Sequence, residues 1–346
     1  GKTTCIMFAA EQWMKAGMNV LFTAPTNKAV KQLEHSARQY GLELSRARFC
    51  TVAKALGLAL LPSEENKYAS QQGASILCDY DVLVMDEGSM VGNTAFFRYL
   101  LPDIEDNNLR TVIMGDKMQL PPVKETNSPA LEHFPVVELT TVERFGEGTG
   151  IANLTTTLRD SIENDKVFLF DAALYDVEVV KPAQFLSRIL EEFDEDTDHE
   201  KVRVLAYTNA RVDRINAAVR EKIYGRDAKM FEVGERVVTG APIVQDRELL
   251  LATDEECYVR NMIESSILDA VSGETYRTLM VTLEPVYATD VGTVYAHVIH
   301  PDEASRLQDS LQAIANKARA KGTPRNQATS LWAKRHRLKD LFSNLR

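Results

Sequence analysis

The sequence predicts an α/β protein with two parallel-sheet domains and a small antiparallel β module inserted into the second domain. Over residues 1–145, apolar runs of strand length alternate with longer helical patterns, which is typical of βαβ units around a parallel sheet. The alternation resumes over residues 146–255, and residues 256–300 change to short β-branched segments separated by turn residues. With 346 residues and 45% apolar content, the chain is long enough for domains that each bury a core.

The first domain begins with a helical pattern over residues 5–16. Three apolar runs follow as candidate strands, at 19–23, Val82–Met85 and 111–114. Each run ends in a loop with small or polar residues. Because ligands of open α/β sheets bind at the carboxyl edge of the strands, we expect the functional residues in these loops.

The second domain is expected to contain a helix over 151–162, a strand over 202–206 and a helix over 212–223. Tyr207, at the end of that strand, is expected in the core rather than on a base-stacking surface, since aromatic residues on strands mostly pack.

The β module has candidate strands at 278–286 and 292–299. Residues 301–346 have the pattern of helices interrupted near Gly322 and Pro324, leading back to the second domain.

Charge is unevenly distributed along the chain. The net charge of −10 argues against a nucleic-acid partner unless the binding groove is locally basic. Residues 191–200 hold seven carboxylates, whereas residues 317–346 hold nine Lys or Arg against one Asp. A helix with its charges in water is the simpler interpretation of the basic stretch, and contact with nucleic acid is the alternative.

Several classes are excluded by composition. The four cysteines form no CxxC pair, so neither a zinc site nor a disulfide framework is indicated. No apolar run is long enough to span a membrane, and the charged opening does not resemble a signal peptide. We therefore expect an intracellular, cytoplasmic protein without a membrane partner.

The chain opens Gly1-Lys2-Thr3-Thr4, the closing half of the pattern G-x-x-x-x-G-K-[ST]. Backbone N–H groups and the lysine of that loop hold nucleotide phosphates. The match is of low specificity by itself because GKT is frequent by chance. The rest of the loop and its strand would precede Gly1.

A second signal is Asp86-Glu87, directly after the apolar run Val82–Met85. A carboxylate at a strand tip can hold Mg²⁺, and its neighbour can position and deprotonate an attacking water. An ordinary strand that runs into a charged turn is the alternative when this signal is taken alone.

Residues 112–123 read Val-Ile-Met-Gly-Asp-Lys-Met-Gln-Leu-Pro-Pro-Val, a third strand followed by a loop with Gly115, Asp116 and Gln119. After GKTT and Asp86-Glu87-Gly88-Ser89, this segment resembles motif III of superfamily 1 DNA helicases. The two earlier segments are similar to their motifs I and II.

Further segments resemble the same family. Residues 24–30 are similar to motif Ia, and residues 139–144 to the segment with the motif IV arginine, although Phe145 replaces the usual glutamine. Thr51 lies where a Thr-x-His element is common, but Ala53 replaces the histidine. Residues 204–209 resemble the start of the second core domain in the RecD-like and Dda-like group.

The resemblance implies a P-loop NTPase fold with two RecA-like domains and an SH3-like β module. It also implies ATP and Mg²⁺ as cofactors. The phosphates would be held by residues of the opening loop and by three later ones: Gly1, Lys2, Thr3, Thr4, Asp86, Gln119 and Arg144. Thr3 and Asp86 would hold Mg²⁺, and Glu87, Gln119 and Arg144 would be catalytic.

The main partner implied by the resemblance is single-stranded DNA. Junctions between duplex and single strand, and replication or repair proteins, are further implied partners. The implied contacts are Pro25, Thr26, Asn27, Lys28 and Thr51. Thr208 and Asn209 are further candidates, with a polar cap at a strand tip as the alternative account. Movement from 5′ to 3′ is typical of this group.

Two other classes stay open from the residues alone. One is a P-loop phosphotransferase acting on a small molecule, in which residues 112–123 match the motif by accident. The other is a catalytically idle nucleic-acid-binding domain. Because the phosphate loop and a later arginine motif are expected to lie beyond the ends of this chain, we expect a chain truncated at both ends.

Overall fold

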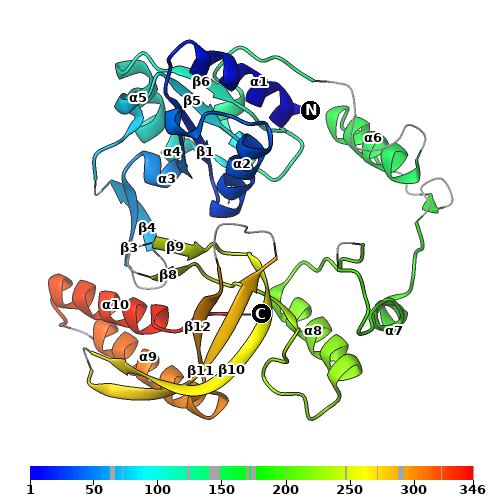
Figure 1. Ribbon diagram of the computed structural model, residues 1–346, viewed down its shortest axis with the longest axis vertical. Coiled ribbons are helices and arrows are strands. Elements are labelled where there is room, and N and C mark those ends of the chain that lie inside the picture. Colours follow the sequence, from blue (N-terminus) through cyan, green and yellow to red (C-terminus); the bar gives the residue numbers. More distant parts are fainter. Residues whose placement is uncertain are drawn as a thin grey trace. The chain divides into compact units, whose positions relative to one another are not determined.

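The computed structural model describes residues 1–62, 67–71, 73–122, 125–139, 149–168, 171–172, 177–199, 201–245, 248–270, 272–286, 292–320 and 322–345. The chain divides into two compact units, Gly1–Val177 and Glu178–Arg346 (Figure 1). The division lies later than the boundary expected at residue 145. Helix α6 (Gly150–Glu163) belongs to the first unit, where Arg159 forms an ion pair with Asp116 at 2.7 Å.

The first unit is built around a four-stranded parallel sheet in the order β2-β1-β5-β6. Its strands are β1 (Val20–Ala24), β2 (Ala47–Thr51), β5 (Val82–Met85) and β6 (Arg110–Ile113). The predictions for β1, β5 and β6 are confirmed to within one residue. The edge strand β2 was not predicted.

Helices and shorter elements surround this sheet. They are α1 (Lys2–Lys15), α2 (Asn27–Gln39), η1 (Leu44–Arg46), α3 (Val52–Ala55), the antiparallel pair β3 (Leu58–Pro62) and β4 (Lys67–Gln71), η2 (Leu77–Asp79), η3 (Gly88–Met90), α4 (Asn93–Ala95), the π-helical segment η4 (Phe96–Leu100), α5 (Leu101–Asp106), η5 (Pro129–Leu131) and α6.

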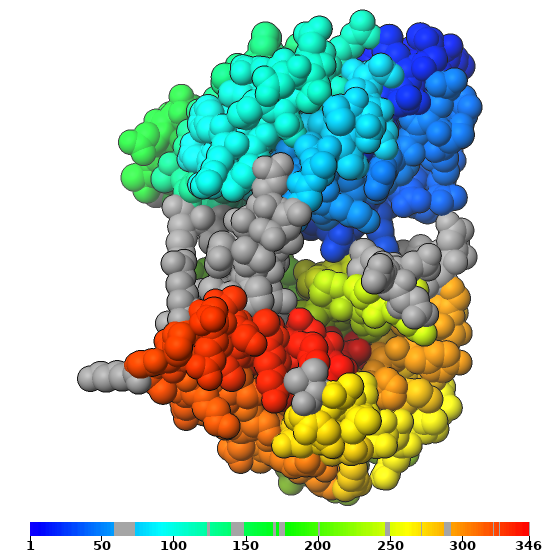
Figure 2. Space-filling view, turned by 90° about the vertical axis from the view of Figure 1, so that its left-hand side faces the viewer, coloured from blue at the N-terminus to red at the C-terminus, as the bar shows by residue number. Residues whose placement is uncertain are grey.

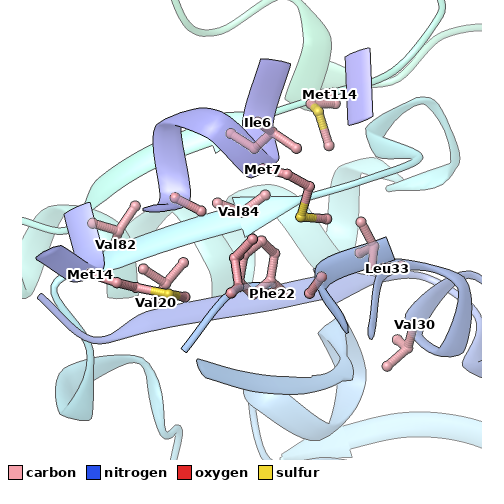
Figure 3. Close-up of a cluster of buried hydrophobic side chains, with 14 residues drawn as sticks. Ile6, Met7, Met14, Val20, Phe22, Val30, Leu33, Val82, Val84 and Met114 are labelled. Carbon is pink, nitrogen blue, oxygen red and sulfur yellow. The ribbon is translucent and has the colours of Figure 1, made fainter. Parts of the chain in front are cut away.

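The sheet has a core on each face, because side chains alternate along buried parallel strands. In β1, Phe22 packs with residues of α1 and α2, while Leu21 faces α3 and α5. Figure 3 shows the first cluster, with Met7 of α1 and Leu33 of α2 against Phe22. The two cores fix the carboxyl ends of the strands, and the loops that leave them, in one place.

The second unit contains an antiparallel sheet in the order β12-β11-β10-β7. Its elements are α7 (Pro182–Glu192), α8 (Asn209–Tyr224), β7 (Arg236–Val238), β8 (Ile243–Gln245), β9 (Glu248–Leu251), β10 (Glu256–Asp269), β11 (Glu274–Pro285), β12 (Val294–Ile299), η7 (Pro301–Glu303), α9 (Ala304–Arg319) and α10 (Arg325–Asp340). The antiparallel module and the helix break near Gly322 and Pro324 are confirmed.

Helices α9 and α10 lie side by side in the second unit, next to the β10–β11 hairpin (Figure 2, orange, red and yellow). Asp269, only 1% exposed, joins the hairpin to α10: its carboxylate accepts hydrogen bonds from Ser272 in the hairpin turn and from Arg337 of α10, which donates at 2.5 Å. Gly273 supplies the left-handed backbone of that turn, with φ +73°.

The prediction of a strand over 202–206 is wrong. The segment forms no strand, and no strand of the described residues pairs with it. Without a paired neighbour it buries little, and Leu205 and Tyr207 are 90% and 101% exposed. The expectation that Tyr207 lies in a core is wrong for the same reason.

Candidate functional site

The loops after the four parallel strands lie at one edge of the sheet of the first unit. Thr51 is paired in register with Ala24, and Met85 with both Thr23 and Ile113. The strands end level, so the segments 25–28, 86–90 and 114–119 leave the sheet next to one another. This is the edge at which we expected the functional residues.

The turn after β5 holds the two candidate acidic residues. Asp86 donates its backbone N–H to the Thr23 carbonyl at 2.8 Å, and its carboxylate accepts the backbone N–H of Glu87 at 2.9 Å. Glu87 has left-handed backbone angles, φ 53° and ψ 39°. Such a conformation costs a non-glycine residue about 1–3 kcal/mol and occurs most often at functional sites. Both side chains are partly exposed and accessible to a ligand.

The turn after β5 is held against the turn after β6 by close backbone contact. The N–H of Gly88 donates to the Met114 carbonyl at 2.8 Å. A Cβ at Gly88 would lie 2.4 Å from Cγ2 of Ile113, and a Cβ at Gly115 would lie 3.1 Å from the Ser89 nitrogen. Any larger residue at either position would therefore force neighbouring atoms to shift, so glycine suits the close approach of the two turns.

Ser128 fastens the same region from a later loop. Its hydroxyl oxygen lies 2.7 Å from the Gly88 carbonyl and 2.6 Å from the Val91 carbonyl, and the side chain is only 5% exposed. The Glu125 carboxylate makes a second such contact, because it accepts a hydrogen bond from the backbone N–H of Asn93 at 2.9 Å. We did not predict either residue. Ser128 precedes a proline and caps η5, which is a sequence signal for a helix start.

The loop after β6 is organised by Asp116. Its carboxylate accepts the Met118 N–H at 3.0 Å, and its backbone carbonyl accepts the Gln119 N–H at 3.0 Å. Arg159 donates to the other carboxylate oxygen at 2.7 Å. Gln119 itself is exposed at the end of this turn.

The ionisation of Asp116 reflects these contacts. Burial raises the pKa of Asp116, but the Met118 N–H, the ion pair with Arg159 and the positive charge of Lys2 outweigh burial and hold the pKa below its ordinary value. Lys2, at the start of α1, therefore acts electrostatically on the loop after β6. The first and third predicted motifs are brought together here.

The opening residues form the first turn of α1. Gly1 is exposed, and its carbonyl accepts the Cys5 N–H at 3.2 Å. Lys2 and Thr3 are partly exposed, while the Thr4 hydroxyl lies 3.0 Å from the Tyr40 hydroxyl. A long helix that starts with GKT presents N–H groups and a cation, both of which suit an anion.

The donor set suits magnesium held with a nucleotide rather than a metal held by protein alone. Within the described residues, no group of three or more His, Cys, Asp or Glu side chains could hold a metal ion. Thr3 and Asp86 offer one hydroxyl and one carboxylate. Mg²⁺ takes oxygen ligands and usually combines one or two carboxylates with substrate phosphates and water. These residues fit that requirement.

The predicted DNA contacts include three threonines that cap helices. Thr26 accepts the Ala29 N–H at 3.2 Å at the start of α2, and Thr51 accepts the Lys54 N–H at 3.2 Å at the start of α3. Thr208 caps α8 in the second unit by accepting the Arg211 N–H at 3.3 Å. A cap is therefore a sufficient structural account of each hydroxyl.

The other candidates fall on both units. Pro25 and Asn27 are partly buried and Lys28 is exposed, all at the carboxyl edge of the first sheet. Asn209 is exposed at the first turn of α8 in the second unit. Arg144 and the segment around it lie outside the described residues. None of the described helices has the length and apolar character that crossing a bilayer requires.

Comparison with known proteins adds the following similarities. The model of the AAA domain family matches residues 1–173. Over 261 residues the chain is 32% identical to the ATP-dependent DNA helicase dda of Enterobacteria phage T4, covering 70% of this chain and 54% of that protein.

More distant similarities extend over most of the chain. Over 328 residues it is 24% identical to the conjugal transfer protein TraA of Agrobacterium fabrum (strain C58 / ATCC 33970), covering 91% of this chain and 28% of that protein. The crystal structure of the Pif1 helicase from Candida albicans superposes with a TM-score of 0.40 at 14% identity, covering 84% of this chain and 77% of that chain. The chain thus spans 54% and 28% of the lengths of the two curated relatives.

Proposed function

Since this chain belongs to the AAA domain family, we propose that it is the ATP-hydrolysing motor of a superfamily 1 helicase that acts on single-stranded DNA. The observation that carries the proposal is the convergence at one sheet edge of the Asp86-Glu87 turn, the loop with Gln119 and the candidate DNA loop 25–28. A nucleotide bound there would touch loops that are continuous with the DNA-facing segments. The relative from phage T4, named as an ATP-dependent DNA helicase, supports this choice of function.

The nucleotide side of the proposal assigns a role to each residue. Lys2 contacts the β and γ phosphates, with Gly1 and Thr4 in the same turn of α1. Thr3 and Asp86 hold Mg²⁺, which when bound neutralises charge on the phosphates. Glu87 orients the attacking water and accepts its proton.

Two further residues complete the nucleotide site in this proposal. Gln119 contacts the γ phosphate and couples its presence to the conformation of the other loops at this edge of the sheet. Arg144 neutralises charge that develops during transfer, which for an arginine finger contributes about 10³–10⁵ in rate.

On the DNA side, Pro25, Thr26, Asn27, Lys28 and Thr51 contact the single strand. These residues follow β1 and β2, and β1 is also paired with β5, which carries Asp86 and Glu87 at its end. A change in the nucleotide turn is therefore transmitted through one strand to the DNA loop. Thr208 and Asn209 supply a contact from the second unit.

The finer features of the proposal follow the family resemblance. The motor moves 5′ to 3′, acts at junctions between single strand and duplex, and works with replication or repair proteins. In this proposal the antiparallel β module is an SH3-like insertion, residues 146–255 are the start of a second RecA-like domain, and residues 301–346 lead back to that domain.

ATP hydrolysis by the whole gene product, with and without single-stranded DNA, tests the proposal. We expect DNA to stimulate turnover, and Glu87→Gln to reduce it by about 10²–10⁴ as expected for loss of a general base. Glu264→Gln is the matched control, because Glu264 lies on β10 with its side chain 73% exposed. It should leave turnover unchanged.

Two outcomes would contradict the proposal. Turnover that is indifferent to DNA would favour a phosphotransferase acting on a small molecule. DNA binding without any turnover would favour a catalytically idle nucleic-acid-binding domain.

A further inference from the structure

Helix α6 is joined to the loop after β6 by one strong contact. The guanidinium of Arg159 donates to Asp116 at 2.7 Å, and the two side chains are 42% and 21% exposed. Glu163, one turn later on α6, lies 4.0 Å from the same guanidinium. The contact joins residues separated by 43 positions in the sequence, so it links α6 to this loop across a long stretch of chain.

Asp116 is the residue that shapes the loop. One carboxylate oxygen and the backbone carbonyl accept the N–H groups of Met118 and Gln119, which closes the turn. Arg159 occupies the second carboxylate oxygen. The Met118 hydrogen bond therefore depends on the orientation of the Asp116 side chain, which Arg159 holds from its second oxygen, while the Gln119 hydrogen bond goes to the Asp116 backbone.

The positive charge of Lys2 also acts on Asp116, where it helps to lower the pKa of the carboxyl group. If Arg159 were absent, one carboxylate oxygen would lose its ion-pair partner, and the carboxylate could turn toward Lys2. Such a turn would release the Met118 hydrogen bond to the carboxylate, one of the two hydrogen bonds that close the turn before Gln119, and so loosen the position of Gln119.

We propose that Arg159 is a positioning residue for ATP hydrolysis, which holds Asp116 and thereby keeps Gln119 in place at the nucleotide. The inference rests on the proposed function, since it assigns Gln119 to the γ phosphate. It adds a role for α6, whose Arg159 was not among the predicted site residues.

The expected effect is on turnover rather than on ATP binding. Gln119 acts on the γ phosphate as the bond breaks, and losing an interaction made only in the transition state lowers kcat while leaving KM little changed. A displacement of about 1 Å costs on the order of 10²-fold when a positioned group is misplaced. We expect Arg159→Ala to lower DNA-stimulated kcat by about 10–100-fold, with KM for ATP within about 3-fold.

The experiment measures kcat and KM of the whole gene product for wild type, Arg159→Ala and Arg159→Lys. Lysine keeps one charged donor for Asp116 and should restore part of kcat. Arg188→Ala is the matched control, because Arg188 is an exposed arginine of α7 whose ion pairs to Glu178 and Glu191 involve no loop of the first unit. It should leave kcat and KM unchanged.

A double-mutant cycle separates positioning from a general loss of structure. If Arg159 acts through Asp116, Arg159→Ala should have no further effect on kcat in an Asp116→Asn background. Should Arg159→Ala unfold at the assay temperature, the same cycle is measured with Arg159→Gln, which removes the charge but keeps a polar side chain suited to a helix.

Additive effects in the cycle, or an Arg159→Ala enzyme with the wild-type kcat, would overturn the inference. A rise in KM alone would also overturn it, because that result would place Arg159 in ATP binding. Failure of the wild-type protein to hydrolyse ATP would instead contradict the proposed function.

Discussion

Gly115→Ala is the perturbation that tests most sharply how the turns after β5 and β6 fit together. The added Cβ would lie 2.9 Å and 3.1 Å from the two terminal methyl groups of Leu131 and 3.1 Å from the Ser89 backbone nitrogen. Leu131 can move, but the Ser89 nitrogen is backbone in the turn that carries Asp86 and Glu87. Overpacking of this kind costs about 1–3 kcal/mol of stability.

The cost can be converted into a melting temperature. For a domain the size of the first unit, each kcal/mol lowers Tm by about 2–4 °C, so we expect a decrease of about 2–12 °C. Thermal unfolding followed by circular dichroism measures it. Gly73→Ala is the control in the same unit, because among the described residues its added Cβ would meet Gly57 atoms alone, at 3.9 Å and 4.0 Å. It should leave Tm within about 2 °C of wild type, as surface changes do.

A second variant shows whether the predicted contact is responsible. In a Leu131→Ala background the two methyl contacts are gone, so Gly115→Ala should cost less there than in wild type. Equal costs in both backgrounds, or an unchanged Tm for Gly115→Ala, would refute the close approach of the two turns.

Three further predictions concern other contacts. Ser128→Ala should lower the free energy of unfolding by about 1–3 kcal/mol in chemical denaturation, because it removes the buried hydroxyl that lies within hydrogen-bond distance of the Gly88 and Val91 carbonyls. Thr26→Ala should cost about 0.5–2 kcal/mol by removing the α2 cap, whereas Thr26→Ser keeps it. Burial raises the pKa of Glu256, but Arg203 and Arg236 outweigh burial and hold the pKa below the ordinary 4.5. The ionised Glu256 carboxylate therefore stabilises the fold above pH 4.5, and this stabilisation disappears as the pH falls through the folded-state pKa. In Glu256→Gln, Tm should therefore decrease less than in wild type when the pH is lowered into the acidic range.

Sequence alone predicted the local elements of the first unit well. The run Val82–Met85 is apolar throughout because β5 is buried on both faces, and such a run followed by two carboxylates indicates a strand and its functional turn. The resemblance to superfamily 1 helicases is confirmed by the AAA domain match and by the 32% identity to the phage T4 helicase.

The edge strand β2 was missed because its pattern is mixed. Of its five residues only Cys50 is buried, and Arg48 is exposed. A strand at the edge of a sheet has one paired neighbour, so its sequence need not be continuously apolar.

Long-range pairing limited the rest of the prediction. The segment 202–206 has the composition of a strand, but composition does not supply the neighbouring backbone that a strand needs. The ion pair between Arg159 and Asp116 likewise depends on where α6 lies against the sheet, which no local pattern indicates.

The most direct test of the account is strand separation from a partial duplex with a 5′ single-stranded tail, measured with the whole gene product. We predict that ATP and Mg²⁺ release the displaced strand, and that Glu87→Gln binds the same DNA without releasing it. A protein that binds the tailed duplex and hydrolyses ATP but releases no strand, from a 5′ or a 3′ tail, would contradict a DNA motor.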